Sequence, residues 1–157
     1  MDEANAPRPR RDVDAGVRRI LVATDRSETA EHAVRFAADM ALRFEAELFL
    51  CQVVVPPVQA PPHAKEELLE YGREFVGELA RAVIGVGEDP AQAIVDTAEA
   101  EDVDVLVVGN VGMSGRKEFL LGNVPNRVSH NSHRTVVIVN TRQRIAEAQK
   151  KRGWFGR

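Results

Sequence analysis

The sequence has a single cysteine, few aromatic residues and no long hydrophobic run. Cys51 is the only cysteine among 157 residues, which excludes an internal disulfide and a cysteine-based zinc site and suits a reducing cytosol. No apolar run approaches the ~18 residues that a membrane-spanning helix needs. The first 19 residues contain no apolar stretch of the kind found in secretory signals. We therefore expect a cytoplasmic protein without a membrane span.

Charge is distributed unevenly along the chain. The net charge of −3 combines a basic segment at 142–157, with six basic residues and one acidic residue, and a body at 20–141 that carries about −9. Because an acidic body does not attract nucleic acid, we expect no nucleic-acid partner. The chain is predicted to form a flexible leader (1–17), one α/β domain (18–141) and a basic C-terminal tail (142–157).

Short, branched apolar runs alternate with amphipathic segments along the body. Strands are predicted at 18–24, 47–55, 82–87, 103–109 and 134–141. Helices are predicted at 25–46, 63–82, 88–102 and 122–130. Ser27 is the predicted N-cap of the first helix, and Asp89 followed by Pro90 is a typical start for the third. The sequence leaves open whether the second helix ends at Leu79 or near Phe75, and with it the entry to the third strand.

This alternation predicts an α/β fold with a doubly wound, five-stranded parallel sheet of order 3-2-1-4-5 and helices on both faces. In that order the first and fourth strands are neighbours, and the chain winds away from them in opposite directions. Such sheets bind ligands in the crevice beyond the carboxyl ends of these two strands. Here the crevice would be lined by "ATDRS" after the first strand and "GNVGMSG" after the fourth.

The second of these segments is rich in glycine. Gly109 and Gly112 allow the backbone to approach a ligand closely, and Gly122 and Asn123 offer a turn and a cap for the last helix. The N-terminus of that helix presents unpaired N–H groups, which bind phosphate. The same glycines are also explained by a simple turn at the end of a strand, and the spacing alone leaves both explanations open. The pattern is neither a P-loop nor a dinucleotide-binding fingerprint.

Three segments carry a resemblance to a known family: "ILVATDRSETAEHAVRFAADMA", "GEDPAQAIVDTAEAEDVDVLVVGNVG" and "GNVGMSGRKEFLLGNVPNRVSHNSHRTVVIVNT". Over roughly residues 18–141 the chain resembles the universal stress proteins. Nucleotide-binding members carry Gly, two residues, Gly, nine residues, Gly and then Ser or Thr, and Gly109, Gly112 and Gly122 keep this spacing. The resemblance implies the doubly wound fold, ATP or a related adenine nucleotide as ligand with Mg²⁺ or Mn²⁺, and a homodimer formed through the fifth strand (135–141).

The resemblance also assigns site residues by position. Asp25 matches an acidic residue near the adenosine and its metal ion, which it would hold weakly and only with the nucleotide. The predicted nucleotide-binding residues are Ala23, Thr24, Asp25, Val53, Val108, Gly109, Asn110, Gly112, Arg116, Gly122, Asn123, Val124 and Pro125. Arg116 is equally explained as a solvated loop residue.

The phosphate end of this predicted site departs from the family pattern at two positions. Asn123 replaces the final Ser or Thr and lacks its compact hydroxyl group, and Pro125 has no N–H to donate. Both differences weaken the expected phosphate contacts without abolishing them.

Catalysis has little support in the sequence. Ser114 and Ser129 have no evident base beside them, so at most slow ATP hydrolysis with a metal ion on Asp25 is expected. The sequence therefore predicts an adenine-nucleotide-binding stress or signalling regulator, non-catalytic or weakly ATP-hydrolysing, whose protein partner is unknown. The alternative is a nucleotide-free interaction protein of the same fold that acts through its dimer face or its tails.

Overall fold

The five strands of the sheet lie parallel in the predicted order. The computed structural model describes residues 16–110 and 124–141. The predicted site residues Gly112, Arg116, Gly122 and Asn123 lie outside this part, as do residues 1–15 of the leader and the tail at 142–157. The sheet runs β3-β2-β1-β4-β5, which confirms the doubly wound topology. The strands are β1 (Arg19–Ala23), β2 (Glu47–Val54), β3 (Ala80–Val86), β4 (Val105–Gly109) and β5 (Thr135–Val139).

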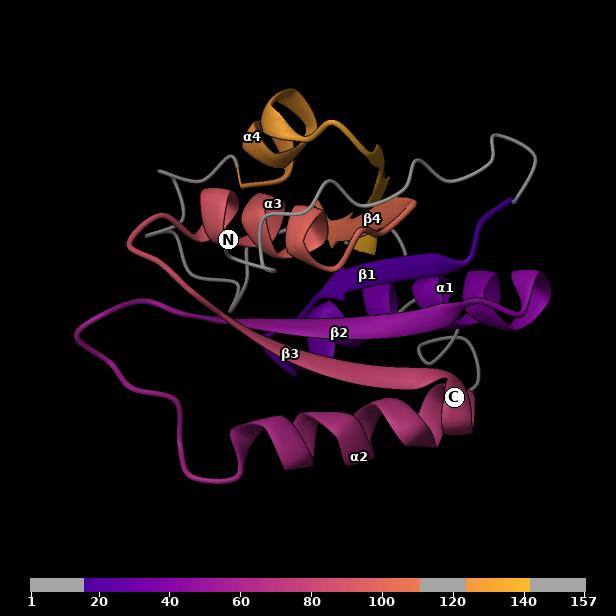
Figure 1. The fold of residues 1–157 in the computed structure, drawn as a ribbon, viewed down its shortest axis with the longest axis horizontal. Helices are drawn as coiled ribbons and strands as arrows, with labels where there is room; N and C mark the ends of the chain where they lie inside the picture. Colours follow the sequence, from indigo (N-terminus) through magenta and orange to yellow (C-terminus); the bar gives the residue numbers. More distant parts are fainter. Residues whose placement is uncertain (1–15, 111–123, 142–157) are drawn as a thin grey trace, which may run out of the picture.

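Helices cover both faces of this sheet (Figure 1). Helices α1 (Glu28–Phe44) and α2 (Ala64–Val76) pack on one face. Helices α3 (Pro90–Ala100) and α4 (Val124–Asn131) pack on the other. Among the described residues, no helix has the length and apolar character needed to cross a membrane.

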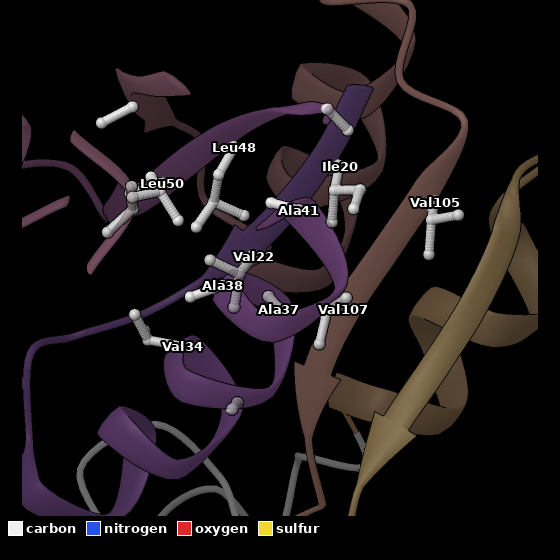
Figure 2. Packing of buried hydrophobic residues seen from close by; sticks show 14 of the residues in the cluster. Ile20, Val22, Val34, Ala37, Ala38, Ala41, Leu48, Leu50, Val105 and Val107 are labelled. Carbon is white, nitrogen blue, oxygen red and sulfur yellow. The ribbon is translucent and has the colours of Figure 1, made fainter. Parts of the chain in front are cut away.

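Two hydrophobic clusters, one on each face, hold the layers together. Successive side chains of a strand point to opposite faces, so Ile20 and Val22 of β1 join the cluster under α1 and α2, while Leu21 joins the cluster under α3 and α4. Figure 2 shows the first cluster, in which small side chains of α1 such as Ala37 and Ala41 lie against β1 and its neighbours. The strands are largely apolar because both faces of the sheet are buried.

The helix starts follow the predicted capping chemistry. The Ser27 hydroxyl oxygen accepts a hydrogen bond from the N–H of Ala30 at 3.1 Å, and α1 begins at Glu28. The Asp89 carboxylate accepts one from the N–H of Ala91 at 3.1 Å, with Pro90 in the first position of α3. Each cap places its helix start beside the carboxyl end of the preceding strand.

The end of α2, which the sequence left open, lies near the earlier of its two candidate positions. The helix ends at Val76, and one 3₁₀ turn, η3 (Gly77–Leu79), leads directly into β3 at Ala80. Gly77 has a φ of 56°, a left-handed conformation that glycine adopts at little cost. This turn replaces a longer connection, so β3 starts two residues earlier than the apolar pattern alone indicates.

Cys51 lies in β2 and is fully buried in the cluster under α3 and α4. Its burial raises the pKa of the thiol to about 11, an effect that outweighs the hydrogen bond with Thr97. Cys51 is therefore a small core residue, as predicted.

Truncating a core side chain should lower the free energy of unfolding far more than truncating a surface side chain. Leu48 is fully buried in the first cluster, whereas Leu42 on α1 is 53% exposed. We expect Leu48→Ala to lower the free energy of unfolding by ~2–5 kcal/mol and Leu42→Ala to change it by less than ~0.5 kcal/mol. Urea denaturation followed by circular dichroism measures both. Equal losses in the two variants would show that the assigned core is wrong.

Candidate functional site

A pocket lies at the carboxyl ends of β1 and β4, where the two halves of the sheet diverge. It is partly open to solvent, and small residues at the strand ends and helix starts form its walls. Ala23 ends β1 at this pocket, and Val108 and Gly109 end β4. The described lining residues are Ala23, Ser27, Thr29, Ala30, Ala33, Ile94, Val108, Gly109, Val124, Pro125 and Thr141.

Two helices begin at the pocket. Ser27, Thr29 and Ala30 come from the cap and first turn of α1, and Val124 and Pro125 from the first turn of α4. The N–H groups of a first helical turn have no partner within the helix and carry partial positive charge. The lining residues in the described part of the chain bear no charged side chain. The pocket walls are therefore uncharged and mainly apolar in their described side chains, with a positive contribution from two helix ends.

The loop between β1 and α1 is held by its own hydrogen bonds. The Thr24 hydroxyl oxygen accepts a hydrogen bond from the N–H of Arg26 at 3.0 Å, and the Asp25 carboxylate accepts one from the N–H of Ser27 at 2.9 Å. The N–H of Thr24 donates to the carbonyl of Cys51 at 2.9 Å, which ties the loop to β2. Arg26 has a φ of 63° and turns its guanidinium over the ring of Tyr71, 5.0 Å from the centroid. These bonds fix the Asp25 backbone at the end of β1.

Asn110, which follows β4, is bonded to the end of β5. Its carbonyl oxygen Oδ1 accepts hydrogen bonds from the N–H of Thr141 at 2.9 Å and from the Thr141 hydroxyl at 3.1 Å. Its amide Nδ2 donates to the side chain of Asn140 at 3.2 Å. Thr141 is buried and lines the pocket. The Asn110 side chain therefore fixes the pocket wall beyond β5.

The start of α4 is joined to the start of α3 by an ion pair. Arg127 of α4 donates through both terminal nitrogens to the carboxylate of Asp89, the cap of α3, with one contact at 2.9 Å. The guanidinium of Arg127 holds the pKa of the Asp89 carboxyl below its usual range. The Asp89 carboxylate thus caps α3 and also binds Arg127 at the start of α4.

The structure brings part of the predicted site together. Ala23, Val108, Gly109, Val124 and Pro125 line one pocket. Thr24 and Asp25 lie in the adjoining loop. Val53 lies in β2, two residues beyond the partner of Ala23 in the register, and packs against the cluster under α3 and α4.

Sequence reasoning missed the opposite wall of the pocket. Thr29, Ala30 and Ala33 of α1 line it, as do Ile94 and Thr141. The residues of α1 were within reach of prediction, since the Ser27 cap places the first turn at the end of β1. Thr141 gave no comparable signal, because its place depends on the register between β4 and β5.

Comparison with known proteins agrees with this architecture. The model of the universal stress protein family matches residues 16–140. The chain belongs to the universal stress protein family. The match covers the whole described domain, from the approach to β1 through β5.

Individual universal stress proteins are similar to this one along most of their length. The protein MJ0531 of Methanocaldococcus jannaschii is 31% identical over 138 residues, covering 78% of this chain and 81% of its own. The protein Rv1636 of Mycobacterium tuberculosis is 32% identical over 145 residues, with coverages of 78% and 95%. A crystal structure of a universal stress protein in complex with cAMP superimposes with a TM-score of 0.65 at 32% identity, covering 80% of this chain and 98% of the other.

Removing the Asn110 side chain should loosen the wall of the pocket. In Asn110→Ala the N–H and the hydroxyl of buried Thr141 lose their acceptor, so we expect a loss of ~1–3 kcal/mol in the free energy of unfolding. Asn140→Ala removes the exposed contact with the Asn110 amide and serves as the control. Urea denaturation of both variants measures the difference. If Asn110→Ala is no less stable than Asn140→Ala, the hydrogen bonds to Thr141 do not support the wall.

Proposed function

We propose that this universal stress protein binds an adenine nucleotide, ATP in the first place, in the pocket between β1 and β4. The observation that carries the proposal is the convergence of two helix starts, those of α1 and α4, on a pocket at the switch point of the sheet. It is supported by the universal stress protein of similar fold, 32% identical, that was crystallised in complex with cAMP.

The strand ends at the pocket are proposed to hold the adenosine part of the nucleotide. Ala23 and Gly109 are small residues at the strand ends, which leave room for a planar base or a ribose, and Val108 adds an apolar contact. The backbone of Thr24 and the side chain of Val53 complete our proposed adenosine site. Asn110 contributes through its backbone, since its side chain bonds to Asn140 and Thr141.

The phosphates would lie against the first turn of α4. Val124 and Pro125 border the pocket there, and the proposed contacts continue through Gly112, Arg116, Gly122 and Asn123, which lie outside the described residues. Because Pro125 lacks an N–H, one donor of this turn is missing, and phosphate binding is proposed to be weaker than in the family pattern.

A divalent ion would be held mainly by the phosphates. Asp25 lies in the loop that adjoins the pocket, and the described residues contain no group of three or more His, Cys, Asp or Glu side chains suited to a metal ion. Mg²⁺ or Mn²⁺ is therefore proposed to bind together with ATP, with Asp25 as its protein ligand.

We propose a regulatory role in the cytoplasm, in which nucleotide occupancy changes a surface that a protein partner recognises during stress. Such a regulator is non-catalytic or hydrolyses ATP slowly. The competing proposal is an interaction protein of the same fold that carries no nucleotide, and the next experiment separates the two.

Nucleotide should stabilise the protein, and filling the pocket should abolish the effect. At ten times its Kd, ATP with Mg²⁺ is expected to add ~1.4 kcal/mol and to raise the Tm by ~5 °C. Ala30→Leu places a larger side chain in the pocket and should remove this shift, whereas Ala100→Leu at the exposed end of α3 should keep it. Differential scanning fluorimetry measures all three proteins. An unchanged Tm of the parent at millimolar ATP favours the nucleotide-free alternative.

We also propose that the protein forms a homodimer through β5. This strand is an edge of the sheet, it is apolar after Thr135, and Ile138 is 41% exposed. An apolar edge strand is a template for pairing with another chain. Val139 is almost fully buried and Val137 packs on the first cluster, so Ile138 is the side chain that tests the edge without entering the core.

A charge at Ile138 should prevent dimer formation. Ile138→Lys is expected to give a monomer by size-exclusion chromatography with light scattering, because the ammonium group would be buried unpaired at the interface. Val86→Lys, on the opposite edge strand β3 where Val86 is 65% exposed, should leave the dimer intact. A dimer that persists in Ile138→Lys and is lost in Val86→Lys would place the interface on β3.

A further inference from the structure

The ion pair between Asp89 and Arg127 joins two helix starts that are far apart in the sequence. Both terminal nitrogens of Arg127 reach the two carboxylate oxygens of Asp89, in the forked geometry that makes arginine pairs directional. The same Asp89 oxygen that receives Arg127 at 2.9 Å also accepts from the N–H of Ala91 at 3.1 Å. The carboxylate is thus fixed by α3 and in turn fixes α4.

Helix α4 has few other means of holding its position. It has only eight residues, a length that is marginal for a helix without tertiary support. Its buried side chains are Val124, Pro125 and Val128. Apolar contacts of this kind resist separation of α4 from the sheet, but they are non-directional and permit sliding and rotation. The forked pair with Asp89 supplies a directional contact.

The two residues of α4 that border the pocket precede Arg127 by two and three positions. A displacement at Arg127 is therefore transmitted within one turn to Val124 and Pro125. Contacts to a bound group depend steeply on position, so a shift of the first turn would weaken its hydrogen bonds to an anion.

We propose that Asp89 and Arg127 are positioning residues that hold the first turn of α4 at the distance required by the phosphate groups of the nucleotide. This rests on the proposed function, in which that turn faces the phosphates. The pair is expected to act on ATP and to leave adenosine binding unchanged, since the proposed adenosine contacts come from β1, β2 and β4.

An electrostatic effect and a positioning role predict opposite changes in the ATP affinity of Asp89→Asn. Asp89→Asn removes a negative charge on the helix pair that includes the proposed phosphate site. Less Coulomb repulsion of the phosphates would by itself tighten ATP binding. Asparagine still caps a helix, so α3 keeps its start. Only the directional pair with Arg127 is lost. Weaker ATP binding in this variant therefore has to come from the position of α4.

The control is Asp39→Asn, which makes the same change in charge. Asp39 pairs with Arg43 at 3.2 Å on the exposed surface of α1, and neither residue lines the pocket. A further variant, Arg127→Lys, keeps the positive charge but loses the two-pronged hydrogen bond to Asp89. Its ATP affinity should lie between those of the parent and Asp89→Asn.

The experiment has two measurements on the full chain. Amide hydrogen exchange without nucleotide should be faster in residues 124–131 of Asp89→Asn than in the parent, with α3 unchanged. Titration calorimetry with ATP and with adenosine should show an ATP affinity ~5-fold lower, as expected from a misplaced contact, and an adenosine affinity unchanged within ~2-fold. Asp39→Asn should match the parent in both.

Each contrary result has its own meaning. Unchanged exchange in α4 of Asp89→Asn overturns the positioning role, and so does ATP binding that is equal to or tighter than that of the parent. An equal loss for ATP and adenosine overturns it as well, since it indicates a general change of the fold. A parent that binds neither ligand refutes the proposed function, and with it the role of the pair toward phosphates.

Discussion

Burial of a parallel sheet on both faces is the constraint on which the rest of this structure depends. The residues of β1 and β4 alternate between two cores, so each strand must be apolar in both directions and cannot also carry polar binding groups. Polar chemistry is therefore restricted to the segments that follow the strands. In a parallel sheet the carboxyl ends of all strands lie along one edge. The loops after β1 and β4 meet there because the two strands are neighbours.

Burial of the sheet on both faces also determines the chemical character of the pocket. Helices that cover the sheet must begin at its carboxyl edge, which brings the partial positive charges of their first turns to the pocket. The pocket walls are supplied by small or apolar residues such as Ala23, Ala30 and Ile94. An apolar cleft with positive helix ends is the physical basis of our proposal of a nucleotide, which combines an apolar base with anionic phosphates.

The strands and the helix starts were predictable because their causes are local, and the strand order followed from their alternation and the handedness of the crossovers. Ser27 and Asp89 cap helices through bonds to residues two or three positions away, and short apolar runs indicate buried strands wherever they occur. The contacts that finish the pocket were not predictable. Asn110 and Thr141 are 31 residues apart, and Asp89 and Arg127 are 38 apart, so their pairing depends on the register of β5 and the docking of α4. The 3₁₀ turn at Gly77–Leu79 was not predicted for a different reason. The residues before it are compatible with a helix as well as with a turn, so the sequence did not decide where α2 ends.

The burial of Cys51 bears on how a protein of this family can respond to oxidants. A thiol whose pKa is about 11 is almost entirely protonated at neutral pH, and oxidation by peroxide proceeds through the thiolate. The chain has no second cysteine with which a disulfide could form within one molecule. This sulfur is thus protected from oxidation in the folded protein, and any sensitivity to oxidative stress has to come through a bound molecule, a partner or another oxidisable side chain.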